Sequence, residues 1–332
     1  MKSSAKLVEP DIGATARGLE LYRSMLRIRL FERRAESEYA AGNISGALHL
    51  SIGQEAIAAG VCAAMAPDDI LTTTHRGHGH CLARGMSPAG MAAELLGRTT
   101  GVCAGKGGSM HMADVAMGVL GANGIVGGGI PLACGAALAS VYQQSDRVAV
   151  AFFGDGAANI GAFSESLNLA AVFELPVVFV AENNGYAEAT PFEAHCAGGS
   201  IARRADGYGI PGITVDGLDV IEVLRVGEDA IAQARAGRGP YLIEAIGHRV
   251  AGHHEGDTQT YRLPGERERM EANDPLDRIK LRLSAEAHEE IARIESEEAA
   301  VIDQAWQEAH SAPFPPEAEL TTDVYVNYGR VA

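Results

Sequence analysis

Short apolar runs that alternate with helical stretches constrain the fold of this chain more than any other feature. Each run is apolar almost without interruption, which is typical of strands buried on both faces of a parallel sheet. Strands of this kind separated by helices predict an α/β fold, with a doubly wound, mainly parallel sheet and helices on both faces. The strands are expected at residues 70–74, 147–153, 176–182, 212–217 and 240–249, and the helices near 53–66, 87–97, 128–143, 160–173 and 219–236.

Further helices are expected outside the alternating region. Apolar positions among arginines predict an amphipathic helix over residues 16–42. A helix over residues 284–310 has apolar residues on one side and a dense acidic face, expected to be solvated, on the other. Because no repeat or linker divides the chain, we expect one domain over residues 1–332, with a C-terminal helical extension from about 270 to 332.

Charge and cysteine usage exclude several classes of protein. The formal net charge of −16 disfavours nucleic acid and anionic membranes as partners. No apolar run approaches the roughly 18 residues of a membrane-spanning helix, and the first eighteen residues lack the apolar core of a secretory signal. The five cysteines include no Cys-x-x-Cys pair, which disfavours a zinc ribbon or a disulfide scaffold. We therefore expect a cytoplasmic protein that acts on a small molecule.

The most specific signal lies between the second and third expected strands. A Gly-Asp-Gly turn at 154–156 follows the second strand, and the third ends in Glu-Asn-Asn at 182–184. A strand, a Gly-x-Gly turn and a helix also begin a dinucleotide-binding fingerprint, in which the glutamate could bind a ribose hydroxyl, so an NAD-dependent dehydrogenase is an alternative. Two features argue against a dinucleotide site. Asn159 replaces the third glycine of the fingerprint, and the Asp155 carboxylate would face and repel the pyrophosphate.

A divalent cation would remove the repulsion between Asp155 and a diphosphate. Magnesium binds carboxylate oxygens together with phosphate oxygens. The Asn184 side chain and the backbone carbonyl of Tyr186 can supply two more oxygen ligands at the end of the neighbouring strand. The backbone amides of Gly156 and Ala157 can donate to the same diphosphate from the start of the helix. The segment therefore predicts a Mg²⁺ site formed by Asp155, Asn184 and Tyr186.

A Gly-Asp-Gly turn followed about thirty residues later by Asn-Asn resembles the fingerprint of thiamine diphosphate enzymes. GDGAAN at 154–159, LPVVFVAENN at 175–184 and Tyr186 are similar to the α subunits of the two-chain 2-oxo acid dehydrogenases. The similarity extends from Arg27 to NDPLDR at 273–278. It implies the thiamine diphosphate-binding fold, with thiamine diphosphate and Mg²⁺ as cofactors.

Histidines cluster around an arginine at residues 74–80. This segment resembles the family loop that presents an arginine to the diphosphate, and residues 49–55 resemble a neighbouring family segment. The resemblance implies that His75 and Arg76 bind the cofactor and that His78 transfers protons. A glycine-bearing loop has no core face on which to bury its histidines, so a functional role is expected for them. A zinc site held by these histidines is the alternative.

Two glycine-rich segments, at 105–111 and 121–127, resemble the wall around the cofactor in this family. The first is not a Walker loop, because Lys106 is followed by glycine. Gly124 and Val126 match positions that contact the cofactor through backbone groups, where a side chain would prevent close approach. Ordinary turn glycines are the alternative.

His253 follows the last expected strand and matches the family histidine that reaches the diphosphate and the reacting centre. It is therefore implied both to bind the cofactor and to act in catalysis. The chain departs from the family at Ala251, where histidine is common, and it lacks the phosphorylatable serine of this loop. A second departure is Ile160, where glutamine is common, which affects a local polar contact.

The family resemblance also implies partners. The glutamate that activates the cofactor belongs to another domain, so a β subunit would complete the site in an α₂β₂ heterotetramer, and this chain alone would be inert. A lipoyl-bearing acyltransferase component would accept the acyl group.

Several segments, including THRGHGHCLARG and AENNGYAEATPFE, are most similar to acetoin dehydrogenase α subunits. This similarity implies cleavage of acetoin to acetaldehyde and a bound two-carbon unit. Pyruvate is the first alternative, since pyruvate-cleaving relatives often have tyrosine where this chain has His75, and branched-chain 2-oxo acids are the second. A non-catalytic, cofactor-holding scaffold is a further alternative, against which Asp155, Asn184 and His253 argue together.

Overall fold

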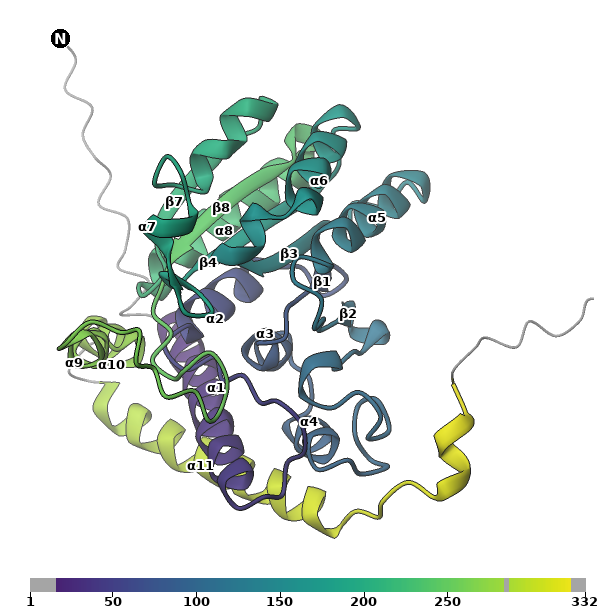
Figure 1. Cartoon of the computed structure of the whole chain (residues 1–332), viewed down its shortest axis with the longest axis vertical. Helices are drawn as coiled ribbons and strands as arrows, with labels where there is room; N and C mark the ends of the chain where they lie inside the picture. Colours follow the sequence, from purple (N-terminus) through teal and green to yellow (C-terminus); the bar gives the residue numbers. More distant parts are fainter. Residues whose placement is uncertain (1–15, 284–286, 324–332) are drawn as a thin grey trace, which may run out of the picture.

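The computed structural model describes residues 16–283 and 287–323 of the chain (Figure 1). Residues 1–15, which carry most of the segment searched for a secretory signal, lie outside the described part, as do residues 284–286 and 324–332 of the expected C-terminal extension. Within the described part, no helix combines the length and the apolar character needed to cross a membrane.

The centre of the molecule is a six-stranded parallel sheet with the strand order β2-β1-β3-β4-β8-β7. The expected α/β fold with a mainly parallel sheet is confirmed. The strands are β1 (Ile70–Thr72), β2 (Val119–Gly121), β3 (Ala149–Gly154), β4 (Val177–Asn183), β7 (Gly212–Asp216) and β8 (Tyr241–Ile246), and a separate antiparallel pair consists of β5 (Tyr186–Ala187) and β6 (Thr190–Pro191).

The helices surround this sheet and extend beyond it. In chain order they are α1 (Ala16–Ala40), α2 (Glu55–Ala64), α3 (His78–Ala83), α4 (Pro88–Leu95), α5 (Gly129–Tyr142), α6 (Gly161–Val172), α7 (Phe192–His195), α8 (Val220–Gln233), α9 (Glu266–Glu271), α10 (Pro275–Arg282) and α11 (His288–Ser311).

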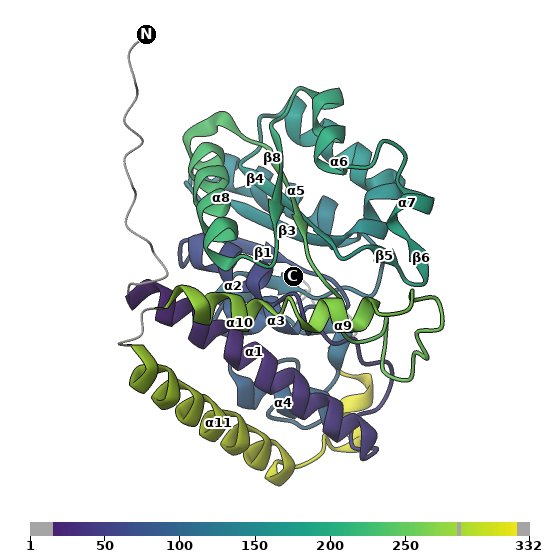
Figure 2. The same cartoon turned by 90° about the vertical axis from the view of Figure 1, so that its left-hand side faces the viewer.

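Alternating residues of β3 show why the strands are apolar throughout. Val150 and Phe152 join the core on the side of α2 and α8, whereas Ala151 and Phe153 join the core on the side of α5 and α6 (Figures 1 and 2). A strand whose two faces both pack against helices has no solvated side, so its period-2 polar pattern disappears.

The terminal helices α1 and α11 lie side by side, as Figure 2 shows. Trp306 of α11 is fully buried, and its ring centroid lies 5.6 Å from that of Phe31 on α1. The acidic face of α11, expected to be solvated, is partly used in this contact, because Arg23 and Arg27 of α1 both donate to the buried carboxylate of Glu298.

Several elements differ from the expectation drawn from the sequence, among them β2 and α3. The strand β2 is missing from the prediction because it has only three residues, and glycine at 118 and 121 interrupts its apolar pattern. The expected loop at 74–80 is only partly a loop, since α3 begins at His78. Its sequence, HGHCLA, is too short to show an apolar helical period, yet five of its six residues are buried.

Candidate active site

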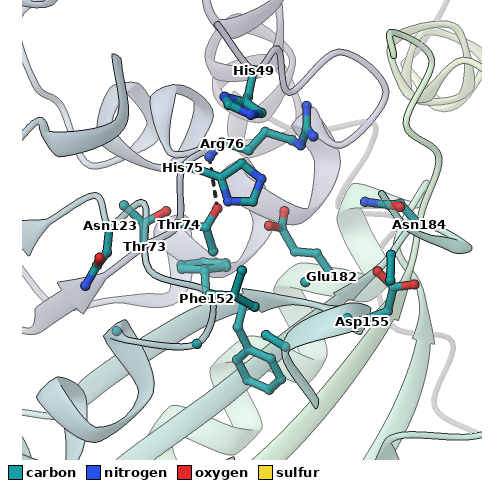
Figure 3. Close-up of a pocket in the computed structure, with 18 of the residues that line it drawn as sticks. His49, Thr73, Thr74, His75, Arg76, Asn123, Phe152, Asp155, Glu182 and Asn184 are labelled. Atoms are coloured by element: carbon teal, nitrogen blue, oxygen red, sulfur yellow. Dashed lines mark hydrogen bonds between the residues drawn. The ribbon is translucent and has the colours of Figure 1, made fainter. Parts of the chain in front are cut away.

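A cavity of about 380 Å³ opens at the carboxyl ends of β1, β3 and β4 (Figure 3). Ligands of open α/β folds bind at this edge of the sheet. Every residue that the sequence predicted to bind the cofactor lines this cavity: His75, Arg76, Gly124, Val126, Asp155, Gly156, Ala157, Asn184, Tyr186 and His253. Residues from five separate segments of the chain therefore meet at one place.

The register of β3 and β4 brings the two predicted metal ligands to neighbouring strand ends. Gly154 pairs with Glu182 across the two strands, so Asp155 and Asn184 both follow the last paired positions. Figure 3 shows the two side chains beside each other at one end of the cavity. The interpretation of the Gly-Asp-Gly and Asn-Asn motifs as one site is thus consistent with the pairing of the strands.

Asp155 is a carboxylate held almost out of solvent, with 2% of its surface exposed. Burial raises its pKa, and His195 of α7, whose Nε2 lies 3.3 Å from Asp155 Oδ2, acts in the opposite direction. A buried anion of this kind gains from a nearby cation. The Asp155 carboxylate and the expected oxygen ligands from Asn184 and Tyr186 are of the type that a hard divalent ion such as Mg²⁺ prefers.

Gln54 fixes the orientation of the Asn184 amide. Asn184 Nδ2 donates to Gln54 Oε1 at 2.9 Å, and Gln54 Nε2 donates to Glu182 Oε1 at 3.2 Å. Asn184 Oδ1 is thereby turned toward the backbone amide of Tyr186, 3.3 Å away. The predicted oxygen ligands of Asn184 and Tyr186 thus belong to one short, hydrogen-bonded turn. Gln54 and Glu182 line the cavity but were absent from the predicted site.

Arg76 places a buried positive charge at the cavity. Its guanidinium donates to the backbone carbonyls of Leu50, at 2.6 Å, and His253, at 2.8 Å. Burial, reinforced by the nearby Arg249, lowers its pKa to about 10, so Arg76 stays protonated at neutral pH. A guanidinium held by carbonyls keeps its full charge available to an anionic ligand.

Arg249 is a second arginine at this cavity, and the sequence analysis missed it. Only 1% of its surface is exposed, and its Nη2 donates to the Glu188 carbonyl and to the Tyr261 hydroxyl, both at 2.7 Å. The sequence could have indicated Arg249, because it lies at the end of the last expected strand, residues 240–249. Ligands bind at the carboxyl ends of such strands.

Three histidines from distant segments gather at the other side of the cavity: His49, His75 and His253. Their ring centroids lie 4.6, 5.2 and 5.5 Å apart. Burial and the charge of Arg76 lower the pKa of His49 to about 3, of His75 to about 2 and of His253 to about 4. All three imidazoles are therefore neutral at pH 7, when each has one ring nitrogen able to accept a proton or bind a cation.

These depressed pKa values predict a loss of stability in mild acid. In the unfolded chain a histidine takes up a proton below about pH 6.5, whereas folded His253 stays neutral down to about pH 4. Because the unfolded state then binds more protons, the free energy of unfolding should decrease as the pH falls from about 6.5 to 4. Thermal unfolding of the wild type and of His253→Gln between these pH values should show a shallower decrease for the variant. Equal slopes would contradict the assigned pKa shift.

His78 does not line the cavity, and the expectation that its loop has no core face on which to bury a histidine is wrong. It is fully buried on α3, with Nδ1 3.0 Å from Glu32 Oε2 and Nε2 3.0 Å from Ser109 Oγ. Both ring nitrogens are therefore used inside the protein, and this geometry supports a role in positioning rather than direct contact with a ligand. His80 is also buried, where its Nδ1 hydrogen-bonds to Thr73 Oγ1 at 2.8 Å.

The two glycine-rich segments differ in their relation to the cavity. Gly124 and Val126 line it, but only Met110 does so from the segment 105–111. That segment wraps around the buried carboxylate of Glu94, which accepts hydrogen bonds from the backbone amides of Cys103, Gly105, Gly107 and Gly108. Most of the segment 105–111 thus forms a structural loop around Glu94. For this segment, the structure favours the alternative of ordinary turn glycines.

Ile160 packs against the second glycine-rich segment. A Cβ on Gly127 would lie 2.1 Å from Ile160 Cδ1, and the φ of Gly127 is +71°. Position 127 therefore requires glycine both for its conformation and for space. Ile160 thus makes an apolar contact at the position where the family resemblance had implied glutamine.

The chain is similar to known proteins over most of its length. Residues 23–318 match the family described as "Dehydrogenase E1 component". The chain is 52% identical to the α subunit of acetoin:2,6-dichlorophenolindophenol oxidoreductase of Bacillus subtilis (strain 168), over 94% of each chain. It is 48% identical to the protein of the same name from Cupriavidus necator, over 93% of this chain and 94% of the relative. It is also 42% identical to the α subunit of the pyruvate dehydrogenase E1 component of Zymomonas mobilis, over 93% of this chain and 88% of the relative.

The motif of a strand, a Gly-x-Gly turn and a helix is compatible with either thiamine diphosphate or a nicotinamide dinucleotide. The family match decides between these two cofactors. This family implies thiamine diphosphate, so the alternative of an NAD-dependent dehydrogenase is wrong. The match covers both strand ends that carry Asp155 and Asn184, as well as His253. The chain belongs to the dehydrogenase E1 component family, whose α subunits are thiamine diphosphate-dependent oxidoreductases.

Proposed function

We propose that this chain binds thiamine diphosphate together with Mg²⁺ in the cavity at the carboxyl ends of β1, β3 and β4. The observation that carries the proposal is the meeting of Asp155 and Asn184 at adjacent strand ends, beside the buried charge of Arg76. Asp155, Asn184 and the backbone carbonyl of Tyr186 would hold the metal. Arg76 and the backbone at Gly156 and Ala157 would hold the diphosphate.

Thiamine diphosphate, when bound, supplies an electron sink that allows a carbon–carbon bond next to a carbonyl to break. The protein's part is to orient the reactants and to move protons. We assign proton transfer to His253, because its neutral imidazole lines the cavity. For His78 we propose an indirect part, in which it holds Glu32 and Ser109 in place.

A β subunit is the partner that we propose for this α subunit, in an α₂β₂ heterotetramer. Ile125 and Val126 support an interface close to the cavity, since they are 73% and 54% exposed in a loop that contributes to its lining. Large apolar side chains left in solvent beside a ligand cavity are typical of a surface that a partner covers. The acyl product would pass to a lipoyl-bearing acyltransferase component.

Acetoin is the substrate that we propose. The two relatives at 52% and 48% identity are named as acetoin oxidoreductase subunits, whereas the relative named as a pyruvate dehydrogenase subunit is 42% identical. The histidines at the cavity are neutral at pH 7. Neutral hydrogen-bonding groups suit the uncharged hydroxyketone acetoin, although Arg76 and Arg249 could also serve a carboxylate.

The substrate assignment can be tested with this chain reconstituted with its β subunit, thiamine diphosphate, Mg²⁺ and an artificial electron acceptor. We expect kcat/KM for acetoin to exceed that for pyruvate by about tenfold or more, which corresponds to about 1.4 kcal/mol of transition-state discrimination. A branched-chain 2-oxo acid serves as the third substrate in the same assay. A higher kcat/KM for pyruvate would instead assign the chain to pyruvate.

Two broader expectations complete the proposal. We propose that residues 1–332 form a single cofactor-binding domain, which the six-stranded sheet and the packing of α1 against α11 support. We also propose a cytoplasmic location, which the five free cysteines support, because thiols persist in a reducing compartment. Lack of turnover in the reconstituted complex, with the cofactor still bound, would favour the non-catalytic scaffold.

A further inference from the structure

The histidines at the cavity have the geometry of an incomplete metal site. One ring nitrogen from each of His49, His75 and His253 lies within 4.8 Å of the others. The three residues come from the segment before α2, the loop after β1 and the segment after β8. Of the histidines at 74–80, for which zinc was the alternative, only His75 belongs to this cluster, because His78 and His80 are buried elsewhere.

A second observation marks this cluster as unsatisfied. Within the described part of the chain, the buried Nδ1 atoms of His49 and His253 have no hydrogen-bond partner. His49 is only 7% exposed. Buried polar atoms in proteins are normally paired, so both nitrogens are available to a ligand. The proposed cofactor would account for His253, whereas no role assigned above accounts for His49.

We propose that His49, His75 and His253 bind a transition-metal ion of the zinc class, separately from the Mg²⁺ proposed at Asp155. Zinc–nitrogen bonds of about 2.0–2.1 Å place the nitrogens of a tetrahedral site about 3.3 Å apart. The cluster must therefore contract by up to about 1.5 Å, which small side-chain rotations can provide. The fourth position would face the cavity, as in zinc sites with three protein ligands and one exchangeable ligand.

The chemistry of the two sites separates their metals. Neutral imidazole nitrogens favour Zn²⁺, Co²⁺, Ni²⁺ and Cu²⁺, whereas carboxylate and carbonyl oxygens favour Mg²⁺. The proposed Mg²⁺ ligands, Asp155, Asn184 and Tyr186, include none of the three histidines. The histidine cluster should therefore bind Co²⁺ in a solution that contains Mg²⁺ in large excess.

The charge of Arg76 limits the affinity of this site. Its guanidinium donates to the backbone carbonyl of His253, so it stands close to the cluster, and its charge disfavours a second cation. An anion such as hydroxide in the fourth position would offset part of this repulsion. We expect micromolar rather than nanomolar binding of Zn²⁺ for this reason.

Metal binding here would have a consequence for the enzyme, and this step rests on the proposed function. His75 and His253 are two of the residues proposed to bind thiamine diphosphate, so a metal that holds their ring nitrogens would compete with the cofactor. Zinc-class metals would act as inhibitors of cofactor loading. The binding of the metal itself does not depend on the proposed function.

The test is a titration of the full chain, without thiamine diphosphate, with Co²⁺ in the presence of excess Mg²⁺. Tetrahedral Co²⁺ gives a strong visible absorption band that octahedral Co²⁺ lacks, and calorimetry with Zn²⁺ gives the affinity. We expect one ion per chain, and an affinity lower by about 100-fold or more in His49→Gln, His75→Gln and His253→Gln. His254→Gln is the matched control, because this neighbouring histidine is not one of the three, and it should bind as the wild type does.

Glutamine keeps the size and polarity of the site, and a thermal unfolding midpoint for each variant separates loss of a ligand from loss of the fold. Absence of the tetrahedral band in the wild type, or equal losses in His254→Gln and the three ligand variants, would overturn the proposed site. Addition of thiamine diphosphate with Mg²⁺ should then release the Co²⁺. Retention of Co²⁺ alongside bound cofactor would refute the competition while the variants still identify the metal site.

Discussion

Asp155→Ala is expected to abolish the Mg²⁺-dependent binding of thiamine diphosphate, with a loss of affinity of at least about 100-fold. The carboxylate is the only anionic group among the three proposed metal ligands, and its side chain is almost fully buried. Without it, the metal loses its strongest protein ligand and the diphosphate loses the cation that bridges it to the protein. Turnover in the reconstituted complex should fall with cofactor binding.

Calorimetric titration of thiamine diphosphate with and without Mg²⁺ measures this effect. Asp155→Asn tests charge at nearly constant shape, and it should show most of the loss. Glu193→Ala is a suitable control, because it removes a carboxylate from an exposed position on α7, two residues from His195. An unchanged affinity in Asp155→Ala would show that the metal is held elsewhere.

His253→Ala is expected to lower kcat far more than it weakens cofactor binding. A general acid–base group contributes typically about 10²–10⁴ in rate, whereas one neutral hydrogen bond contributes on the order of 1 kcal/mol, or about fivefold in affinity. Arg76 binds the backbone carbonyl of His253 and not its ring, so the substitution leaves that contact in place. The diphosphate should therefore still be held.

Steady-state kinetics of the reconstituted complex at saturating thiamine diphosphate test this assignment, with His254→Ala as the neighbouring control. The hydrogen bond from the His253 amide to Asp257 Oδ2, at 2.7 Å, also involves only the backbone, so the loop should keep its shape. Full kcat at saturating cofactor would show that His253 only binds the cofactor, and a β-subunit group would then have to transfer the proton.

The sequence predicted the sheet and the strand-end ligands because both depend on local patterns. A strand packed on both faces is apolar at every position, and a turn at the carboxyl end of such a strand must point toward the ligand edge. Asp155 and Asn184 could be placed together on this ground alone. The pairing of β3 with β4 then brought them to the same edge, as the parallel arrangement requires.

The histidines could not be assigned in the same way, because their partners lie far away in the sequence. His78 was interpreted as part of a ligand loop, but it binds Glu32, which is 46 positions earlier, and it is buried on a helix of six residues. Glu94 likewise organises a glycine-rich segment that resembled a cofactor wall. Only the fold shows which of several polar side chains face the cavity and which satisfy one another behind it.

The most direct test of the account compares turnover of acetoin by this chain alone and by the chain reconstituted with its β subunit. Both assays contain thiamine diphosphate, Mg²⁺ and an artificial electron acceptor, and gel filtration tests for the proposed α₂β₂ assembly. We predict no measurable turnover for the chain alone and Mg²⁺-dependent turnover for the complex, because under the proposed function this chain contributes the diphosphate side of the site and the β subunit contributes the rest. Turnover by the chain alone, or by the complex without a divalent metal, would contradict the account.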